Sequence, residues 1–205
     1  MTDPSRPHGD GMHRRPEVPD PLLRLAGLQS GLVTREQALG LGLSREALGR
    51  LVNAGTWHRV RPGLFATVPV APTWETLAWG GVLLGGSGAR LGPEASGHLY
   101  GLVRRPPRPI DVLVPFASPK RVQGPWQFIR ERDGVRPGRS PGTPPRLTPE
   151  CTVLDLAAVR PAGDVVGLVT AAVQKGLTTP GRLRSLLAYP AGLATGPALP
   201  ARRAV

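Results

Sequence analysis

The sequence predicts an α+β protein: an N-terminal winged helix-turn-helix followed by a small mixed α/β domain with a short antiparallel sheet. Two observations carry this prediction. Residues 33–67 show a helix, a tight turn, a second helix and then two short strands, which is the element order of a winged helix-turn-helix. Beyond residue 73, apolar segments with helical spacing are interrupted by strand-like runs at 110–116 and 127–132.

The chain begins with a segment that cannot fold by itself. Residues 1–19 are polar and proline-rich with almost no apolar side chains, so we expect a disordered tail. At Asp20 the pattern changes: Asp20 is a cap, Pro21 suits the first helical position, and a stripe of leucines predicts a helix that ends near Gly31. This helix would be the first of three in a domain at residues 20–68.

Capping signals define the next two helices. Thr34 followed by Gln37 forms a capping box, and the glycines at 40 and 42 allow a sharp reversal. Ser44 then caps a second helix, which Gly55 ends. Residues 57–60 and 64–67 are predicted strands on either side of a turn at 61–63.

The second of these helices carries side chains suited to reading DNA. When its apolar residues point inward, Arg45, Arg50 and Asn53 point outward; arginine can bind guanine and asparagine adenine in the major groove. We expect these three to contact bases. The remaining predicted DNA-binding residues are expected to contact the sugar-phosphate backbone of the DNA: Arg35, Ser44, His58, Arg59 and Arg61. Glu46 lies on the same face and would repel phosphate. A solvated helix face in a small structural domain is the alternative.

The charge of the chain supports a nucleic-acid partner only modestly. The net charge is +12. Lys120 and Lys175 are the only lysines, and the abundance of arginine, alanine, glycine and proline is what a GC-rich genome would produce without selection for binding. The basic excess is also spread along the body of the chain.

Several classes of site are disfavoured. Cys151 is the only cysteine, so we expect no disulfide and no cysteine zinc site, and the two histidines of the N-terminal tail do not suggest a metal site. No apolar run approaches the ~20 residues of a membrane span, and the start lacks the apolar core of a signal peptide. We therefore expect a cytoplasmic protein without cofactor or metal.

The second domain is predicted at residues 73–188. Thr73 caps a helix at 74–84, Pro93 opens a short helix, and the strands at 110–116 and 127–132 pair. Thr148 caps a helix at 151–159 in which Asp155 faces away from the apolar residues. Helices at 163–175 and 180–188 follow, and residues 189–205 are expected to form a loose tail.

Catalytic patterns in this domain are incomplete. The glycines at 85–88 lack the lysine-serine pair of a phosphate loop, and Ser96 with His98 has no evident acid partner. Asp111 and Glu131 follow the order of a PD-(D/E)xK nuclease, but arginine stands where the lysine is needed. We therefore expect no enzymatic activity. A protein-interaction module that uses its basic surface remains a third class of function.

The segment VTREQALGLGLSREALGRLVNAGTWHRVRPGLFA resembles the N-terminal domain of AbiEi-type antitoxins of type IV toxin–antitoxin systems. The shared features are a Thr-Arg start, a Gly-Leu-Ser turn, a Gly-x-Trp and the Arg-x-Gly-hydrophobic-Phe-Ala wing. A looser resemblance continues through LGPEASGHLYGL, PIDVLVP, LTPECTVLDLA and AAVQKGLTTPGRL, so that about residues 20–190 are covered.

This resemblance implies a DNA-binding transcriptional regulator that represses its own operon and counters a nucleotidyltransferase-like toxin. The partners it implies are double-stranded DNA and that toxin; a homodimer is a separate expectation of ours. Many actinobacterial relatives carry an endonuclease-like domain after this region, and this chain stops where that domain would begin. The chain departs from the family at Cys151 and at Pro93-Glu94. A remnant of an endonuclease-domain protein, or a module that binds the toxin, therefore remains an alternative.

Overall fold

The computed structural model describes residues 18–69, 72–118, 124–132, 135–138 and 142–188. The predicted tail at 189–205 and residues 1–17 of the N-terminal tail lie outside the described residues. The N-terminal elements are α1 (Asp20–Leu28), β1 (Leu32–Thr34), α2 (Arg35–Gly40), α3 (Arg45–Asn53), β2 (His58–Arg61) and β3 (Leu64–Ala66). They are followed by α4 (Trp74–Gly85), β4 (Arg90–Leu91), α5 (Pro93–Leu99), β5 (Ile110–Pro115), β6 (Trp126–Glu131), α6 (Pro149–Ala158), α7 (Ala162–Gln174) and α8 (Pro180–Leu187).

The caps of α2 and α3 form as the sequence predicts. The Thr34 hydroxyl accepts the backbone N–H of Gln37 at 3.1 Å, and the Gln37 side chain accepts that of Thr34 at 2.9 Å, which completes the capping box. Ser44 accepts the N–H of Ala47 at 3.1 Å. Between the helices, Gly42 has φ +94°, a left-handed conformation that glycine adopts without strain. Local chemistry thus fixes the helix-turn-helix.

The first sheet has one more strand than the sequence suggested. Its order is β1-β3-β2 with antiparallel pairs, and β1 is too short to show an alternating pattern in the sequence. Val33 pairs with Phe65, and both side chains join the core under α1, α2 and α3. Leu32 pairs with Ala66, and both face the opposite side, because successive side chains on a strand alternate. Strands β1 and β3 are therefore covered on both faces, whereas all four residues of β2 are exposed.

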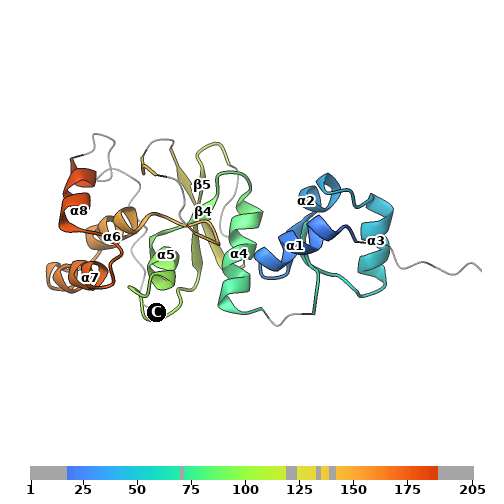
Figure 1. Ribbon diagram of the computed structural model, residues 1–205, viewed down its shortest axis with the longest axis horizontal. Coiled ribbons are helices and arrows are strands. Elements are labelled where there is room, and N and C mark those ends of the chain that lie inside the picture. The colour runs from blue at the N-terminus through green and yellow to red at the C-terminus, as the bar shows by residue number, and fades with distance from the viewer. Residues whose placement is uncertain (1–17, 70–71, 119–123, 133–134, 139–141, 189–205) are drawn as a thin grey trace, which may run out of the picture.

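Helix α4 stands between the winged-helix end and the rest of the molecule (Figure 1). It is apolar nearly all round, as expected of a helix that is buried on several sides. Trp79 packs on Leu32 and Leu64 of the first sheet, while Ala78 and Val82 pack on the second sheet. The helix therefore joins the two parts of the protein through a continuous apolar contact.

The second sheet is mixed. In its order β4-β5-β6, β4 pairs with β5 antiparallel, but β5 pairs with β6 parallel, which corrects the expectation of a purely antiparallel sheet. The burial of β5 agrees with this parallel pairing: residues 110–114 are all buried, and parallel strands are commonly covered on both faces. Here α4 covers one face, and Leu147 and Cys151 pack on Leu113 from the other.

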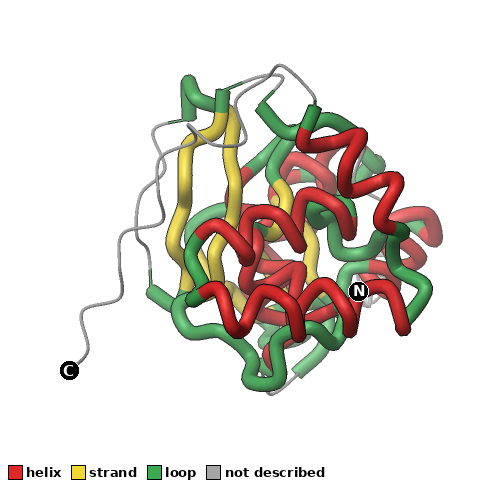
Figure 2. Tube along the Cα trace, turned by 90° about the vertical axis from the view of Figure 1, so that its left-hand side faces the viewer, coloured by secondary structure: helices red, strands yellow, loops and turns green. Residues whose placement is uncertain are grey.

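The last helices form a separate apolar cluster at the far end of the molecule. Val153 and Leu156 of α6 pack with Leu168 and Ala172 of α7 and with Leu183 of α8. Viewed from this end, helices lie in front of and beside the strands (Figure 2). The elements are thus stacked in layers along one long axis, with α3 at one end and the α6–α8 cluster at the other (Figure 1).

Candidate nucleic-acid interface

Helix α3 has one buried face and one fully exposed face. Ala47, Leu48 and Leu51 lie in the core together with Trp57 and Phe65. The opposite face consists entirely of exposed residues: Arg45, Glu46, Gly49, Arg50 and Asn53. The three side chains predicted to contact bases therefore share one solvent-facing surface at the end of the molecule.

Glu46 is the one acid on this surface. Its pKa lies below the ordinary value, because its own backbone amide and then the Ser44 hydroxyl stabilise the carboxylate, and the charges of Arg50 and Arg45 add to this. Arg50 follows Glu46 by four residues, a spacing that brings opposite charges together on a helix. The negative charge of Glu46 therefore offsets part of the attraction of the neighbouring arginines for phosphate. Ser44 is exposed and acts as the cap of this helix.

Two further predicted residues converge at the base of the wing. The guanidinium carbons of Arg35, at the start of α2, and of Arg59, on β2, each lie 6.0 Å from the centre of the Phe65 ring. Both side chains are exposed. Because Phe65 also packs in the α1–α3 core, Arg35 and Arg59 lie on the side of the wing that faces the helix-turn-helix. The structure thus brings together two cations that the sequence predicted to contact backbone phosphate.

The other two predicted wing residues lie on the opposite face of the sheet. His58 pairs with Ala66, and Arg61 pairs with Leu64 after a bulge between Arg59 and Arg61. Since Leu64 and Ala66 face α4, His58 and Arg61 point to that side as well. The bulge places Arg61 on the face of His58, whereas Arg59 points to the opposite face, so the three predicted wing residues do not share one surface.

Arg61 also makes a contact that the sequence gave no means of finding. Its guanidinium carbon lies 5.9 Å from the centre of the Trp126 ring on β6, a cation–π arrangement between the wing and the second domain. Trp126 is buried, and its indole N–H donates to the carbonyl of Leu77 at 2.6 Å. No local pattern connects positions so far apart in the chain, so only the fold reveals this contact.

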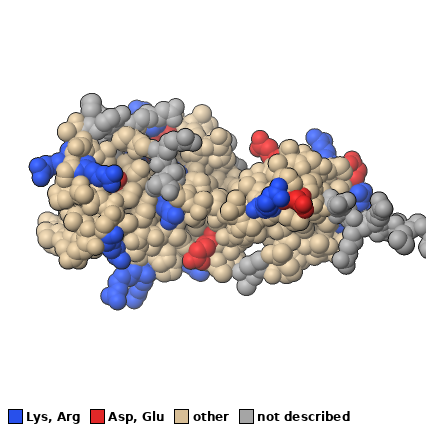
Figure 3. All heavy atoms as spheres, viewed as in Figure 1, with Lys and Arg blue, Asp and Glu red and all other residues tan. Residues whose placement is uncertain are grey.

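On the face of the molecule seen in Figure 3, positive charge is not concentrated in one patch. Lys and Arg side chains are spread over the visible face, and Asp and Glu side chains lie among them at the winged-helix end (Figure 3). This agrees with the even distribution of bases along the sequence.

The two carboxylates considered for nuclease chemistry are too far apart to share a metal ion. In the parallel register Asp111 pairs with Gln127 and Glu131 pairs with Pro115, so four residues, or roughly 13 Å, separate them along the strands. Asp111 accepts the backbone N–H groups of Ala95 and Glu94 at 2.8 and 3.0 Å. Among the described residues, no group of three or more His, Cys, Asp or Glu side chains is arranged to hold a metal ion.

Glu131 belongs to a network of ion pairs. It binds Arg90 and Arg136, each at 2.7 Å, and Arg136 binds Asp155 at 2.6 Å. The prediction that Asp155 faces away from the interior is therefore wrong: it is only 8% exposed. Burial raises the pKa of Asp155, and Arg136 opposes that shift. The partner lies in a loop with no recognisable pattern, so the sequence could not indicate it.

Ser96 and His98 have structural roles. Ser96 is buried; its hydroxyl donates to the carbonyl of Leu91 at 3.0 Å and accepts the N–H of Leu147 at 3.1 Å. His98 Nδ1 lies 3.0 Å from the carbonyl oxygen of Val103, and its ring meets Trp74 edge-on. Neither arrangement matches a nucleophile with its base. In the described part of the chain, no helix is long and apolar enough to cross a membrane.

The fold and this surface define the class of the N-terminal part. A helix-turn-helix with a buried and an exposed face, followed by an antiparallel hairpin, is a winged helix-turn-helix. The model of one protein family, described as "Transcriptional regulator, AbiEi antitoxin", matches residues 20–68. Residues 20–68 are therefore similar to the AbiEi antitoxin family of transcriptional regulators. Among curated proteins, no match is found.

Proposed function

We propose that the protein is a DNA-binding transcriptional regulator that represses its own operon through α3 and the wing. Arg45, Arg50 and Asn53 would contact bases in the major groove, while Arg35 and Arg59 would contact phosphate. A cytoplasmic location, a homodimer on DNA and a nucleotidyltransferase-like toxin as partner belong to the same proposal. The protein would act by binding and not as an enzyme.

One observation carries this proposal: the exposed face of α3. Bases are read by side chains that project from a rigid helix able to enter the major groove. The apolar residues of α3 fix it to the core, and its free face carries two arginines and an asparagine. The family match over residues 20–68 adds independent support, because members are described as transcriptional regulators.

The first test measures base recognition. The full chain is titrated into a labelled duplex that covers the promoter of its own gene, and into a scrambled duplex of the same composition. We expect tighter binding to the promoter, and we expect Arg50→Ala to cost about 1–3 kcal/mol on the promoter and to reduce the preference. Arg184→Ala, which removes an exposed arginine from α8 at the far end, is the matched control. Equal affinity of Arg50→Ala and the wild type for the promoter would show that α3 is not the recognition helix.

The second test measures backbone contact. Arg59 is placed to neutralise a phosphate, so Arg59→Ala should weaken promoter and scrambled duplexes about equally. It should also reduce the slope of log affinity against log salt concentration by ~1. Titrations over a series of salt concentrations give this slope. If Arg59→Ala instead altered sequence preference while the salt slope stayed that of the wild type, the assignment of the wing to phosphate would be incorrect.

A further inference from the structure

We propose that Gly49 sets how closely α3 approaches the floor of the major groove, and that this approach lets the short side chain of Asn53 reach an adenine. This role of Gly49 rests on the proposed function, since it takes α3 as the recognition helix. Gly49 has no side chain with which to contact a base, and it is therefore a positioning residue for Asn53.

Gly49 lies at the centre of the face that α3 turns to solvent. An α-helix turns by about 100° per residue, so Glu46, Gly49 and Asn53 form a nearly straight row along its surface. Arg45 lies on one side of this row and Arg50 on the other, and all five residues are exposed. A duplex that contacts this face therefore meets a gap at Gly49 between two arginines.

The packing of the protein gives no reason for a glycine at position 49. Nothing lies within 4 Å of the point where a Cβ would be, and glycine is disfavoured relative to alanine inside a helix. At Gly80 of α4, by contrast, a Cβ would lie 3.0 Å from the ring of Trp126. Open space alone assigns no role, since Gly27 of α1 and Gly167 of α7 share it. Position decides, because Gly49 is the one of these three that lies among the side chains assigned to bases.

The lengths of the neighbouring side chains show what the gap provides. The guanidinium group of an arginine lies several bonds from the backbone, whereas the amide of an asparagine is bonded directly to its Cβ. Asparagine can bind N6 and N7 of adenine together, and its short side chain does so only when the helix lies close to the base edges. A side chain at position 49, one turn before Asn53, would stand against the groove floor and hold the helix away. Arg45 and Arg50 can span the added distance, so the loss should fall on Asn53.

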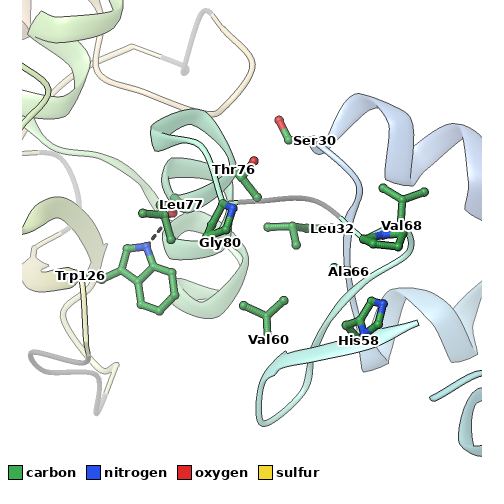
Figure 4. A pocket seen from close by; sticks show the side chains of 12 residues that line it. Ser30, Leu32, His58, Val60, Ala66, Val68, Thr76, Leu77, Gly80 and Trp126 are labelled. Carbon is green, nitrogen blue, oxygen red and sulfur yellow. Dashed lines mark hydrogen bonds between the residues drawn. The ribbon is translucent and has the colours of Figure 1, made fainter. Parts of the chain in front are cut away.

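The wing holds the DNA backbone through side chains that can follow such a change. Arg59 faces the helix-turn-helix beside Arg35. His58 and Val60 instead line the cavity between the wing sheet and α4, on the opposite side of the sheet (Figure 4). The wing therefore presents long, flexible arginines to phosphate, and their contribution should not depend on the residue at position 49.

The first test separates folding from DNA binding. Thermal unfolding and promoter titrations of the full chain compare Gly49→Ala with Gly167→Ala, the same change on an exposed position of α7 at the other end of the molecule (Figure 1). Each substitution should leave the midpoint of unfolding unchanged or raise it by up to about 4 °C. Gly49→Ala should weaken promoter binding about tenfold, and Gly167→Ala should leave it unchanged. Wild-type promoter affinity of Gly49→Ala would overturn the role of Gly49.

The second test identifies the contact that Gly49 permits. Each adenine of the promoter is replaced in turn by 7-deazaadenine, which lacks the N7 acceptor. At one adenine or more, the replacement should weaken the wild type severalfold and leave Gly49→Ala and Asn53→Ala unaffected. The double variant Gly49→Ala/Asn53→Ala should bind like Gly49→Ala alone, whereas Arg59→Ala should weaken Gly49→Ala by the same factor as the wild type. Losses from Gly49→Ala and Asn53→Ala that multiply would show that Asn53 does not depend on Gly49.

These outcomes are distinct from a failure of the proposed function. A wild type that binds promoter and scrambled duplexes equally, or whose affinity Arg50→Ala does not change, would overturn α3 as the recognition helix, and the role of Gly49 would fall with it. A specific affinity that depends on Arg50, and that Gly49→Ala leaves intact, would overturn the role of Gly49 alone.

Discussion

Asp111 shows how one buried side chain can organise a domain. It is 3% exposed and accepts two backbone N–H groups at the start of α5, so it ties that helix to the middle strand of the second sheet. Burial raises its pKa to about 6, because the loss of solvation outweighs the stabilisation by the Ala95 and Glu94 amides. The side chain is therefore a structural anchor that is easier to bury protonated.

This pKa predicts a pH dependence of stability. Between the usual value of 3.8 and about 6, the folded protein holds a proton that the unfolded chain releases. This proton contributes about 3 kcal/mol to the free energy of unfolding when the pH is below the usual pKa of the carboxyl group. The contribution is lost as the pH rises through about 6. The free energy of unfolding of the wild type minus that of Asp111→Asn should therefore be larger near pH 4 than near pH 7.

Urea titrations at several pH values measure this difference. Asp111→Asn should be less stable than the wild type by about 1–3 kcal/mol near pH 7, because an amide has one acceptor oxygen for two N–H donors, and by a larger amount near pH 4. Asp164→Asn, at an exposed position in α7, is the control for the loss of a carboxylate at the surface. A difference between wild type and Asp111→Asn that stays constant with pH would contradict a raised pKa.

At the scale of elements, the close packing of α4 against the second sheet requires glycine, because glycine has no side chain. A Cβ at Gly81 would lie 2.6 Å from Cδ1 of Trp126 and 2.8 Å from a methyl group of Val112, so the missing side chain lets the helix approach the second sheet. Alanine is otherwise favoured over glycine in helices by roughly 0.5–1 kcal/mol. Sterics and helix propensity therefore act in opposite directions at this position.

We expect Gly81→Ala to destabilise the protein by about 1–3 kcal/mol, because Trp126 and Val112 must both shift in a packed core. The matched control is Gly167→Ala in α7, where nothing lies within 4 Å of the added Cβ. Gly167→Ala should leave the free energy of unfolding unchanged or increase it by up to about 1 kcal/mol. Thermal unfolding of both variants gives the comparison. Equal effects of the two substitutions would mean that propensity, and not close packing, decides the residue at 81.

For the molecule as a whole, the winged helix is not an independent unit. Leu32, Leu64 and Ala66 are buried against Trp79 of α4, on the face of the sheet opposite the α1–α3 core. A fragment of residues 18–69 would expose this face to water. Since each buried leucine contributes roughly 1.5–3 kcal/mol, we expect the fragment to be much less stable than the full chain.

The substitution Leu64→Ala distinguishes the loss of the contact with α4 from the general effect of shortening the chain. Leu64→Ala should cost about 2–5 kcal/mol in the full chain, where it leaves a cavity. In the fragment it should cost about 0.5 kcal/mol or less, because the side chain already faces solvent. Urea unfolding of the full chain and of the fragment, each with and without Leu64→Ala, gives the four free energies of unfolding. A fragment as stable as the full chain, or equal costs of Leu64→Ala in both, would show that α4 does not support the wing.

Local rules in the sequence account for much of the fold. The capping box at Thr34, the Ser44 cap and the spacing of apolar residues predict α2, α3 and the exposure of Arg45, Arg50 and Asn53, because caps and helical periodicity act within a few residues. The family resemblance of the N-terminal domain follows from the same stretch, which the family match over residues 20–68 confirms.

The tertiary structure decided everything that depends on distant partners. It pairs β5 with β6 in parallel, turns Asp155 toward Arg136, and adds β1 to the wing sheet. It also separates Arg59 from Arg61 and places Arg61 over the ring of Trp126. The physical reason is that the face on which a strand residue lies is set by the pairing register of its strand. An ion pair such as Arg136–Asp155 likewise forms only when the fold brings its two segments together. Both depend on contacts between segments far apart in the chain.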